Sequence, residues 1–200
     1  MDAKTQKSEM TRTAIVGAAM DLASAEGLEA ITLQAVATRL GLSKSGVFSR
    51  VSSREALQKA VIEEFGRRFL ADVFVPAMQK PKGLARLDDI VARWIVRTRD
   101  VESETGCIYT AGAFELDDRE GELRDVLVEE VTRWRAALRR SVQQAVDTGE
   151  LRADTDPAQL VSEINGLIMS LLHDARFLRD SRAGDRALHS WQRTVASYRA

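Results

Sequence analysis

The fold of this chain is decided by the stretch Thr32–Arg54, which reads TLQAVATRLGLSKSGVFSRVSSR. Within 33–40 the apolar residues recur at helical spacing, which predicts a short helix with one apolar face. Thr32 can cap the start of this helix with its hydroxyl, and Gly41 can adopt the left-handed conformation that often follows a last helical residue. The first part of the stretch is therefore expected to be a short helix with defined ends.

A second short helix is predicted directly after the first. Ser43 can cap it, and its body should run from about Lys44 to Arg50. Only a few residues separate the two helical bodies, so a tight turn must join them. This spacing favours a helix-turn-helix, in which the second helix can enter the major groove of DNA.

The charge of the same window agrees with DNA binding. Residues 30–54 contain no Asp or Glu, although the whole chain has a net charge of -1, and their basic residues are Arg39, Lys44, Arg50 and Arg54. Basic side chains release counterions from DNA phosphates, which is the source of most non-specific affinity. A solvated helical hairpin in an ordinary helical protein is the alternative interpretation.

The composition is that of a folded helical protein. Of the 200 residues, 44% are hydrophobic and 30% are charged, which excludes a disordered chain. Three prolines and the lack of alternating polar and apolar runs predict an all-α fold. A single cysteine excludes a disulfide framework. The polar N-terminus and the lack of an apolar run near the roughly 20 residues that span a bilayer predict a cytoplasmic protein without a membrane partner.

Residues 12–65 resemble the N-terminal domain of the tetracycline-repressor (TetR) family of bacterial transcription regulators. The agreeing positions are Arg12, Ile15, Leu22-Ala23, Gly27, Thr32, Val36-Ala37, Leu40-Gly41, Ser43-Lys44 and Ser53–Leu57. Three positions depart from the family pattern. Ser45-Gly46 stands where Gly-Thr or Gly-Ala is usual, Phe48 replaces a usual Tyr, and Val51 replaces a usual Phe. Without the Tyr hydroxyl, a phosphate contact that is common in the family is missing.

The resemblance implies an all-α fold with two parts. An N-terminal three-helix helix-turn-helix DNA-binding domain would occupy residues 1–53. A long helix from about residue 54 would join it to a larger helical ligand-binding and dimerisation domain, 54–200. The implied function is transcriptional regulation by a repressor, which binds a palindromic operator as a homodimer and is released by a small-molecule effector of unknown identity. The alternative is a helical ligand-binding or partner-binding module without DNA binding.

The predicted DNA contacts lie in the helix-turn-helix. Four side chains of the second helix should face the groove of a double-stranded operator, namely Lys44, Ser45, Ser49 and Arg50, with Gly46 between them. Thr32, Gln34, Ser43 and Arg54 should contact phosphates or flanking bases. Phe48 should pack against a sugar or against the core of the domain.

The two last predicted helices carry apolar bands wider than one packing contact needs. In the resembling family the final two helices usually form a four-helix interface between subunits. The predicted dimer interface therefore comprises Leu160, Ile164, Leu167, Leu171, Leu178, Leu188, Trp191 and Val195. The alternative is that this band is core within one subunit.

An effector pocket in the second domain is the family precedent, and aromatic residues at helical spacing offer a lining for it. The predicted lining comprises Trp94, Cys107, Tyr109, Phe114, Trp134, Met169, His173 and Phe177. Ordinary core packing is the alternative for each of them. For Cys107, a redox role is a second alternative. The segment Thr105–Asp118 also holds two glycines, Gly106 and Gly112, which suggest close approach by a neighbour or a ligand.

Enzymatic chemistry finds little support. The chain has two histidines and one cysteine, and it contains no HExxH, phosphate-binding glycine loop, dinucleotide fingerprint or paired-cysteine metal motif. We therefore predict no catalytic residues, no metal and no cofactor. The acidic residues Asp117, Asp118 and Glu120 should form a solvated turn rather than a catalytic pair. An enzyme that uses Cys107 remains as a third alternative.

Overall fold

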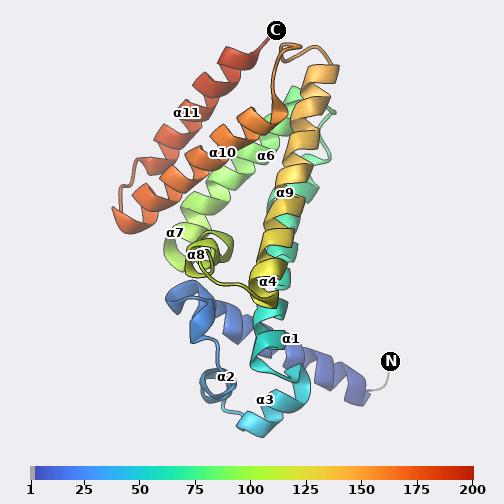
Figure 1. Cartoon of the computed structure of the whole chain (residues 1–200), viewed down its shortest axis with the longest axis vertical. Helices are drawn as coiled ribbons and strands as arrows, with labels where there is room; N and C mark the ends of the chain where they lie inside the picture. Colours follow the sequence, from blue (N-terminus) through green and yellow to red (C-terminus); the bar gives the residue numbers. More distant parts are fainter. Residues whose placement is uncertain (1–2) are drawn as a thin grey trace. The chain divides into compact units, whose positions relative to one another are not determined.

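The structure, a computed structural model, describes the backbone of residues 3–200 and the side chains of residues 11–200. Figure 1 shows a chain of helices joined by short connections. The elements are α1 (Ala3–Glu26), η1 (Leu28–Ala30), α2 (Leu33–Leu40), α3 (Lys44–Val51), α4 (Arg54–Phe69), η2 (Leu70–Phe74), α5 (Val75–Ala77), α6 (Leu84–Arg97), η3 (Thr98–Glu102), α7 (Ser103–Thr105), α8 (Ile108–Glu115), α9 (Glu122–Asp147), α10 (Pro157–Leu172), η4 (His173–Phe177) and α11 (Ala183–Tyr198).

The predicted all-α class is confirmed. η1 is a 3-10 turn, and η2, η3 and η4 are turns of π-helix. In the described part of the chain, extended pairing is limited to an isolated backbone bridge between Leu151 and Arg199. None of the described helices combines the length and the apolar character that a membrane crossing requires.

Contacts divide the chain into two compact units. Unit 1 comprises the residues up to Arg67 together with Cys107–Glu130, and unit 2 comprises Arg68–Gly106 and Val131–Ala200. In unit 1, α1 packs on η1, α2 and α3, and α8 packs on η1. The buried side chains of α1 that support this packing are Ile15, Val16, Ala18, Ala19, Met20 and Ala23. The long first helix thus holds the two short helices together.

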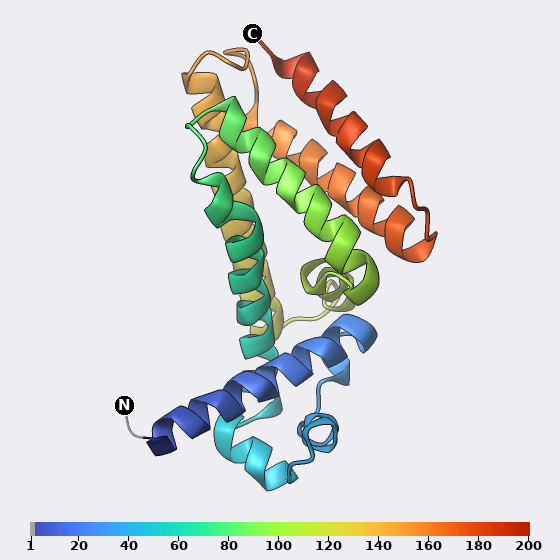
Figure 2. The same cartoon turned by 180° about the vertical axis from the view of Figure 1, so that it is seen from behind.

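Unit 2 is built around the packing of α6, α10 and α11. Figures 1 and 2 show α10 and α11 side by side and antiparallel, and both helices contact α6. Trp191 of α11 ties two of these helices together, because its Nε1 donates a hydrogen bond of 3.1 Å to Asp88 Oδ1 of α6. The same core includes buried residues of α9, namely Trp134, Leu138, Val142 and Ala145.

Candidate nucleic-acid interface

The turn between α2 and α3 has the geometry that its sequence predicts. Thr32 Oγ1 accepts the backbone N–H of Ala35 at 3.0 Å, and Ser43 Oγ accepts that of Gly46 at 3.0 Å. Gly41 ends α2 in the left-handed region, with φ 64°. A side chain at such a position is strained, so glycine suits it. Local chemistry therefore sets both ends of the turn.

The orientation of α3 follows from its two valines. Val47 and Val51 are buried, as are Val36 and Ala37 of α2, so one side of each helix faces the core. The opposite side of α3 is exposed and carries Lys44, Ser45, Phe48, Ser49 and Arg50. Phe48 is 55% exposed, which rules out packing into the core and leaves its contact with a sugar as a prediction. Gly46 lies half-buried between these residues.

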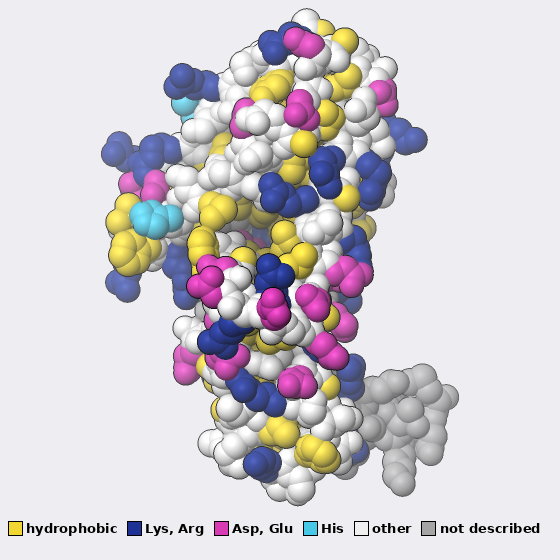
Figure 3. Space-filling view, in the orientation of Figure 1, with side chains coloured by type: hydrophobic (Ala, Val, Ile, Leu, Met, Phe, Trp, Pro, Cys, Tyr) yellow, Lys and Arg dark blue, Asp and Glu magenta, His cyan; other side chains and the backbone are white. Residues whose placement is uncertain are grey.

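Two of the four basic residues in the window are paired with acids. Arg39 Nη2 lies 3.1 Å from Asp21 Oδ2, and Arg54 Nη2 lies 2.9 Å from Glu29 Oε2. No ion pair or side-chain hydrogen bond joins Lys44 or Arg50 to another described residue, so both charges face solvent. On the face drawn in Figure 3, hydrophobic and basic side chains lie over the α2–α3 region of unit 1.

The guanidinium of Arg54 contacts the backbone of the segment that precedes α2. Its Nε donates to the carbonyl oxygen of Ile31 at 2.8 Å, and its Nη2 donates to the carbonyl oxygen of Glu29 at 2.8 Å. Gln58 adds a buried hydrogen bond of 2.8 Å to the carbonyl oxygen of Leu28. The guanidinium of Arg54 therefore fastens the connection between α1 and α2 to the start of α4, a role that the sequence did not predict, and its contact with phosphate stays a prediction.

Glu115 at the end of α8 completes this fastening, and our sequence reasoning missed it. Its carboxylate accepts the N–H of Leu28 at 2.8 Å and the N–H of Glu29 at 2.6 Å. Close packing supports the contact, because a Cβ on Gly112 would lie 2.9 Å from Leu28 Cδ1 and 3.0 Å from Leu127 Cδ2. The prediction of close approach at a glycine in this segment is thus confirmed at Gly112. The only sequence signal was that glycine, since Glu115 lies far from Leu28 along the chain.

Two family models match the chain. The model described as "Bacterial regulatory proteins, tetR family" matches residues 15–61, and the model described as "Tetracyclin repressor-like, C-terminal domain" matches residues 83–191. The second match alone covers more than half of the chain. The chain belongs to the TetR family. It therefore has the fold of a transcriptional regulator with a helix-turn-helix DNA-binding domain, and its domains are those of a transcription factor rather than of an enzyme.

Solved structures of TetR-family regulators share the whole fold. A regulator from Chloroflexus aurantiacus has a TM-score of 0.82 at 21% identity, with 97% of this chain and 98% of that chain covered. A regulator from Cytophaga hutchinsonii has a TM-score of 0.81 at 18% identity, with 97% of each chain covered. AibR, solved in complex with isovaleryl coenzyme A and operator DNA, has a TM-score of 0.69 at 19% identity, with 88% and 95% covered. No curated protein sequence matched this chain.

The eight predicted pocket residues of this TetR-family protein do not line one common site. Trp94 and Trp134 pack together, with ring centroids 5.2 Å apart, and with Phe69 and Phe74 they form what we call the aromatic cluster of unit 2. Four of the others are exposed, namely Phe114, Met169, His173 and Phe177. Of these, His173 and Phe177 form a second pair, with ring centroids 5.3 Å apart. Tyr109 packs on Phe65 in unit 1, and the thiol-bearing Cys107 is half-buried in the same unit.

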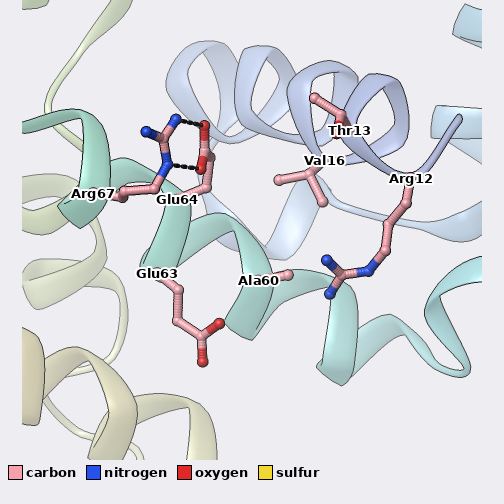
Figure 4. A pocket seen from close by; sticks show the side chains of 7 residues that line it. All are labelled: Arg12, Thr13, Val16, Ala60, Glu63, Glu64 and Arg67. Atoms are coloured by element: carbon pink, nitrogen blue, oxygen red, sulfur yellow. Dashed lines mark hydrogen bonds and ion pairs between the residues drawn. The ribbon is translucent and has the colours of Figure 1, made fainter. Parts of the chain in front are cut away.

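Two surface cavities of the described chain lie apart from the predicted lining residues. The larger, about 370 Å³, lies between α1 and α4, where Arg67 and Glu64 form two hydrogen bonds with each other (Figure 4). Both signs of charge line it, so it offers no site selective for phosphate or for an apolar ligand. The smaller, about 240 Å³, lies in unit 2 and includes Arg135 and Arg139 of α9.

The predicted dimer residues separate into two groups. Five are buried in the core of the single chain and are not available to a second copy: Leu160, Ile164, Leu171, Trp191 and Val195. Leu167 is partly buried, whereas Leu178 and Leu188 are exposed. In Figure 3 hydrophobic side chains and a histidine protrude beyond the end of α10, where Phe177 and Leu178 are 77% and 57% exposed. The core alternative therefore holds for the five buried positions.

Proposed function

We propose that this TetR-family protein is a repressor that binds a palindromic operator as a homodimer and is released by a small-molecule effector. The observation that carries the proposal is the outer side of α3. It presents Lys44 and Arg50 without acidic partners in the described chain, beside the short side chains of Ser45 and Ser49. Such a surface lets a DNA backbone approach closely, and the release of counterions from the phosphates then adds to the affinity.

The flanking contacts of the operator would come from the helix ends of the turn. Thr32 and Gln34 are exposed at the start of α2, and Ser43 is exposed at the start of α3. Helix N-termini attract phosphates, because their N–H groups and dipoles point toward the anion. The hydroxyl of Thr32 uses an oxygen lone pair for the helix cap and retains a proton to donate. The hydroxyl of Ser43 caps α3 and also shares a hydrogen bond of 3.1 Å with Ser45 Oγ. Arg54 holds the connection behind this surface, and it would add a phosphate contact from its exposed side.

The dimer would form through the outer side of α10 and α11. On α10 this side carries the exposed small residues Ser162, Gly166 and Ser170 with Met169, and on α11 it carries Leu188. Apart from the backbone of its own helix turn and its two chain neighbours, no heavy atom of the described chain lies within 4 Å of a Cβ built on Gly166, so the helix surface is open there. A two-fold partner could approach closely at this glycine. Dimerisation also places two recognition helices on adjacent half-sites of one operator.

Effector control requires a ligand that prefers the conformation in which the recognition helices are misplaced. The aromatic cluster of unit 2 would bind such a ligand. Unit 1 supplies a mechanical connection, because α8, within the region matched by the C-terminal family model, holds the α1–α2 connection through Glu115. A change that moves α8 would therefore move the base of the helix-turn-helix.

The decisive test is a gel shift with genomic duplexes recovered by the wild-type protein. Replacing Lys44→Ala and Arg50→Ala together should abolish the specific shift, while circular dichroism reports unchanged helicity. The matched control is Lys80→Ala with Lys82→Ala, which removes the same charge from an exposed loop of unit 2. An unchanged shift by the first pair would rule out α3 as the DNA-contacting element. Failure of the wild type to bind any duplex would favour the ligand-binding or partner-binding module instead.

A further inference from the structure

The aromatic cluster of unit 2 is centred on Trp134. Its ring lies edge-to-face with three neighbours, at centroid distances of 4.5 Å to Phe69, 5.2 Å to Trp94 and 5.9 Å to Phe74. Such edge-to-face arrangements match the positive edge of one ring to the negative face of another. Phe74 is the member that remains partly exposed, whereas the other three are buried. The cluster is thus open to solvent on the side of Phe74.

Trp134 is also unusual as a polar group. Its side chain is 94% buried, since the residue is 6% exposed, and its Nε1 finds no hydrogen-bond partner in the described chain. Buried indole N–H groups normally have an acceptor in the protein. A buried donor without one has given up its hydrogen bond to water with no replacement, which destabilises the folded state. The faces of neighbouring rings provide only a weak substitute. An acceptor is therefore missing from the cluster.

Two turns of π-helix border the cluster. η2 carries Phe74, and η3 directly follows the helix that carries Trp94. Within η3, Thr98 Oγ1 donates to Glu102 Oε2 at 3.2 Å, and both residues are buried. π-helical turns inside α-helices occur frequently at functional sites. Here such turns directly follow the helices that carry Phe69 and Trp94.

From these observations we infer that the aromatic cluster is the effector site and that its ligand is a flat, neutral, largely aromatic molecule with a carbonyl or ether oxygen that accepts a hydrogen bond from Trp134 Nε1. The inference rests on the proposed function for the existence of an effector, and it adds the chemical class. The ligand ring takes the place of Phe74 against Trp134, and its oxygen supplies the acceptor that the cluster lacks.

The charges around the cluster select a neutral ligand. The guanidinium of Arg97 lies 5.8 Å from the centroid of the Phe69 ring. Arg97 is already paired with Glu102, at 3.1 Å, and with Asp72. An anionic ligand would have to compete with these two carboxylates for the same cation, so it gains little from entering. A neutral aromatic ligand leaves the buried network intact.

The test uses two probes of closely matched shape: 1-acetonaphthone, which has a carbonyl oxygen, and 1-isopropenylnaphthalene, in which a CH2 group replaces that oxygen. Each is titrated into ¹⁵N-labelled full-length protein while the indole N–H resonances of Trp94, Trp134 and Trp191 are followed. Replacing Trp134→Phe assigns the central resonance and provides the variant without a donor. Affinities are measured in parallel by equilibrium dialysis.

We expect 1-acetonaphthone to move the Trp134 indole proton downfield and to bind the wild type about three- to tenfold more tightly than 1-isopropenylnaphthalene, as one net hydrogen bond requires. In the Trp134→Phe variant the two affinities should become equal. Phe74→Ala should strengthen binding of both probes, since it removes the ring that the ligand displaces. The inference is overturned if neither probe binds, if the shift appears at Trp191 instead, or if the affinity ratio survives in Trp134→Phe.

The same samples separate this inference from the proposed function. DNA binding by the wild type and by Trp134→Phe, without any probe, tests whether the protein is a DNA-binding regulator. Both should bind the recovered duplex equally. Loss of probe discrimination with intact DNA binding would reject the ligand class alone, whereas failure of the wild type to bind DNA would reject the proposed function.

Discussion

The helix pairs α2–α3 and α10–α11 are each formed by two helices in contact, yet different forces hold them. The members of the first pair have 8 residues each and those of the second have 16. In the short pair two residues of each helix are buried, and its geometry depends on the caps of Thr32 and Ser43. In the long pair five residues of each helix are buried, so apolar packing sets its geometry.

This difference has a functional consequence. A short pair leaves most of its side chains free to contact DNA, but it needs help from outside to hold a fixed orientation. That help comes from Arg54, Gln58 and Glu115, which bind the backbone of the preceding connection. A long pair is held in place by its own apolar packing, so its solvent-facing side is available to contact a second subunit. Polar contacts should therefore control DNA binding, and apolar surface should control assembly.

The largest expected effect is on assembly. Gly166→Arg places a long charged side chain where the outer side of α10 is open, so the single chain should fold normally while the dimer is lost. Light scattering should then report the monomer mass of 22.2 kDa. Affinity for a two-half-site operator should fall by about 100-fold or more, because bivalent binding is lost.

The control for this prediction is Ala85→Arg, which adds the same side chain at an exposed position of α6. It should keep both the dimer mass and the operator affinity. A dimer mass for Gly166→Arg would show that subunits do not meet through this side of α10.

An intermediate effect is expected at the contact behind the short pair. Glu115→Ala deprives the N–H groups of Leu28 and Glu29 of their acceptor, which should lower the free energy of unfolding by about 1–2 kcal/mol in urea titrations. DNA affinity should fall several-fold, since the base of the helix-turn-helix is loosened. Asp118→Ala, a change at an exposed position two residues beyond Leu116, is the matched control. Equal urea midpoints of unfolding for the two variants would contradict a role for Glu115 in holding the connection between α1 and α2.

The smallest expected effects are on the pH dependence of stability, and they have opposite signs in the two units. The hydrogen bond from Arg54 lowers the pKa of the Glu29 carboxyl below its ordinary value of 4.5. This pair therefore stabilises unit 1 above about pH 4.5, and the contribution is lost as the pH falls through the lowered pKa. Glu29→Gln should reduce stability at pH 7 by less than about 1 kcal/mol, because the pair is exposed. The difference from wild type should shrink in acid.

In unit 2, burial raises the pKa of Asp88 above its ordinary value of 3.8, in spite of the hydrogen bond from Trp191. The ionised carboxylate therefore costs stability at neutral pH, and this cost disappears as the pH falls through the raised pKa. Asp88→Asn keeps an acceptor for Trp191 and removes the charge, so it should raise the melting temperature at pH 7 and lose this advantage in acid. A lower melting temperature at pH 7 would contradict the assignment.

The sequence predicted the helix-turn-helix well because local chemistry determines it. Thr32, Gly41 and Ser43 act within a few residues of their own positions, and each has the predicted geometry. The inward side of α3 also follows from the spacing of Val47 and Val51. Arg54 could not be placed in this way, since its partners Glu29 and Ile31 come from an earlier helix connection. Glu115 joins residues that lie 86 and 87 positions away.

The second unit was harder to predict because a wide apolar band does not say which side faces inward. Leu160, Ile164 and Trp191 have the pattern of an interface and are core instead. Aromatic spacing likewise grouped Trp134 with Phe114 and Phe177, although the latter two are exposed. The unpaired N–H of Trp134 is visible only once the surrounding side chains are placed. The spacing of apolar residues predicts the helices, whereas the tertiary contacts determine which side of each helix is buried.

The most direct test of the central claim is the salt dependence of DNA binding, measured by fluorescence anisotropy on a random duplex. The wild type should lose affinity steeply with salt, with a slope of about -0.9 for each phosphate that it neutralises. The Lys44→Ala, Arg50→Ala variant should show a slope less negative by roughly two to four, since two charges leave each of one or two bound subunits. An identical slope for the two proteins would contradict the claim that α3 lies against DNA.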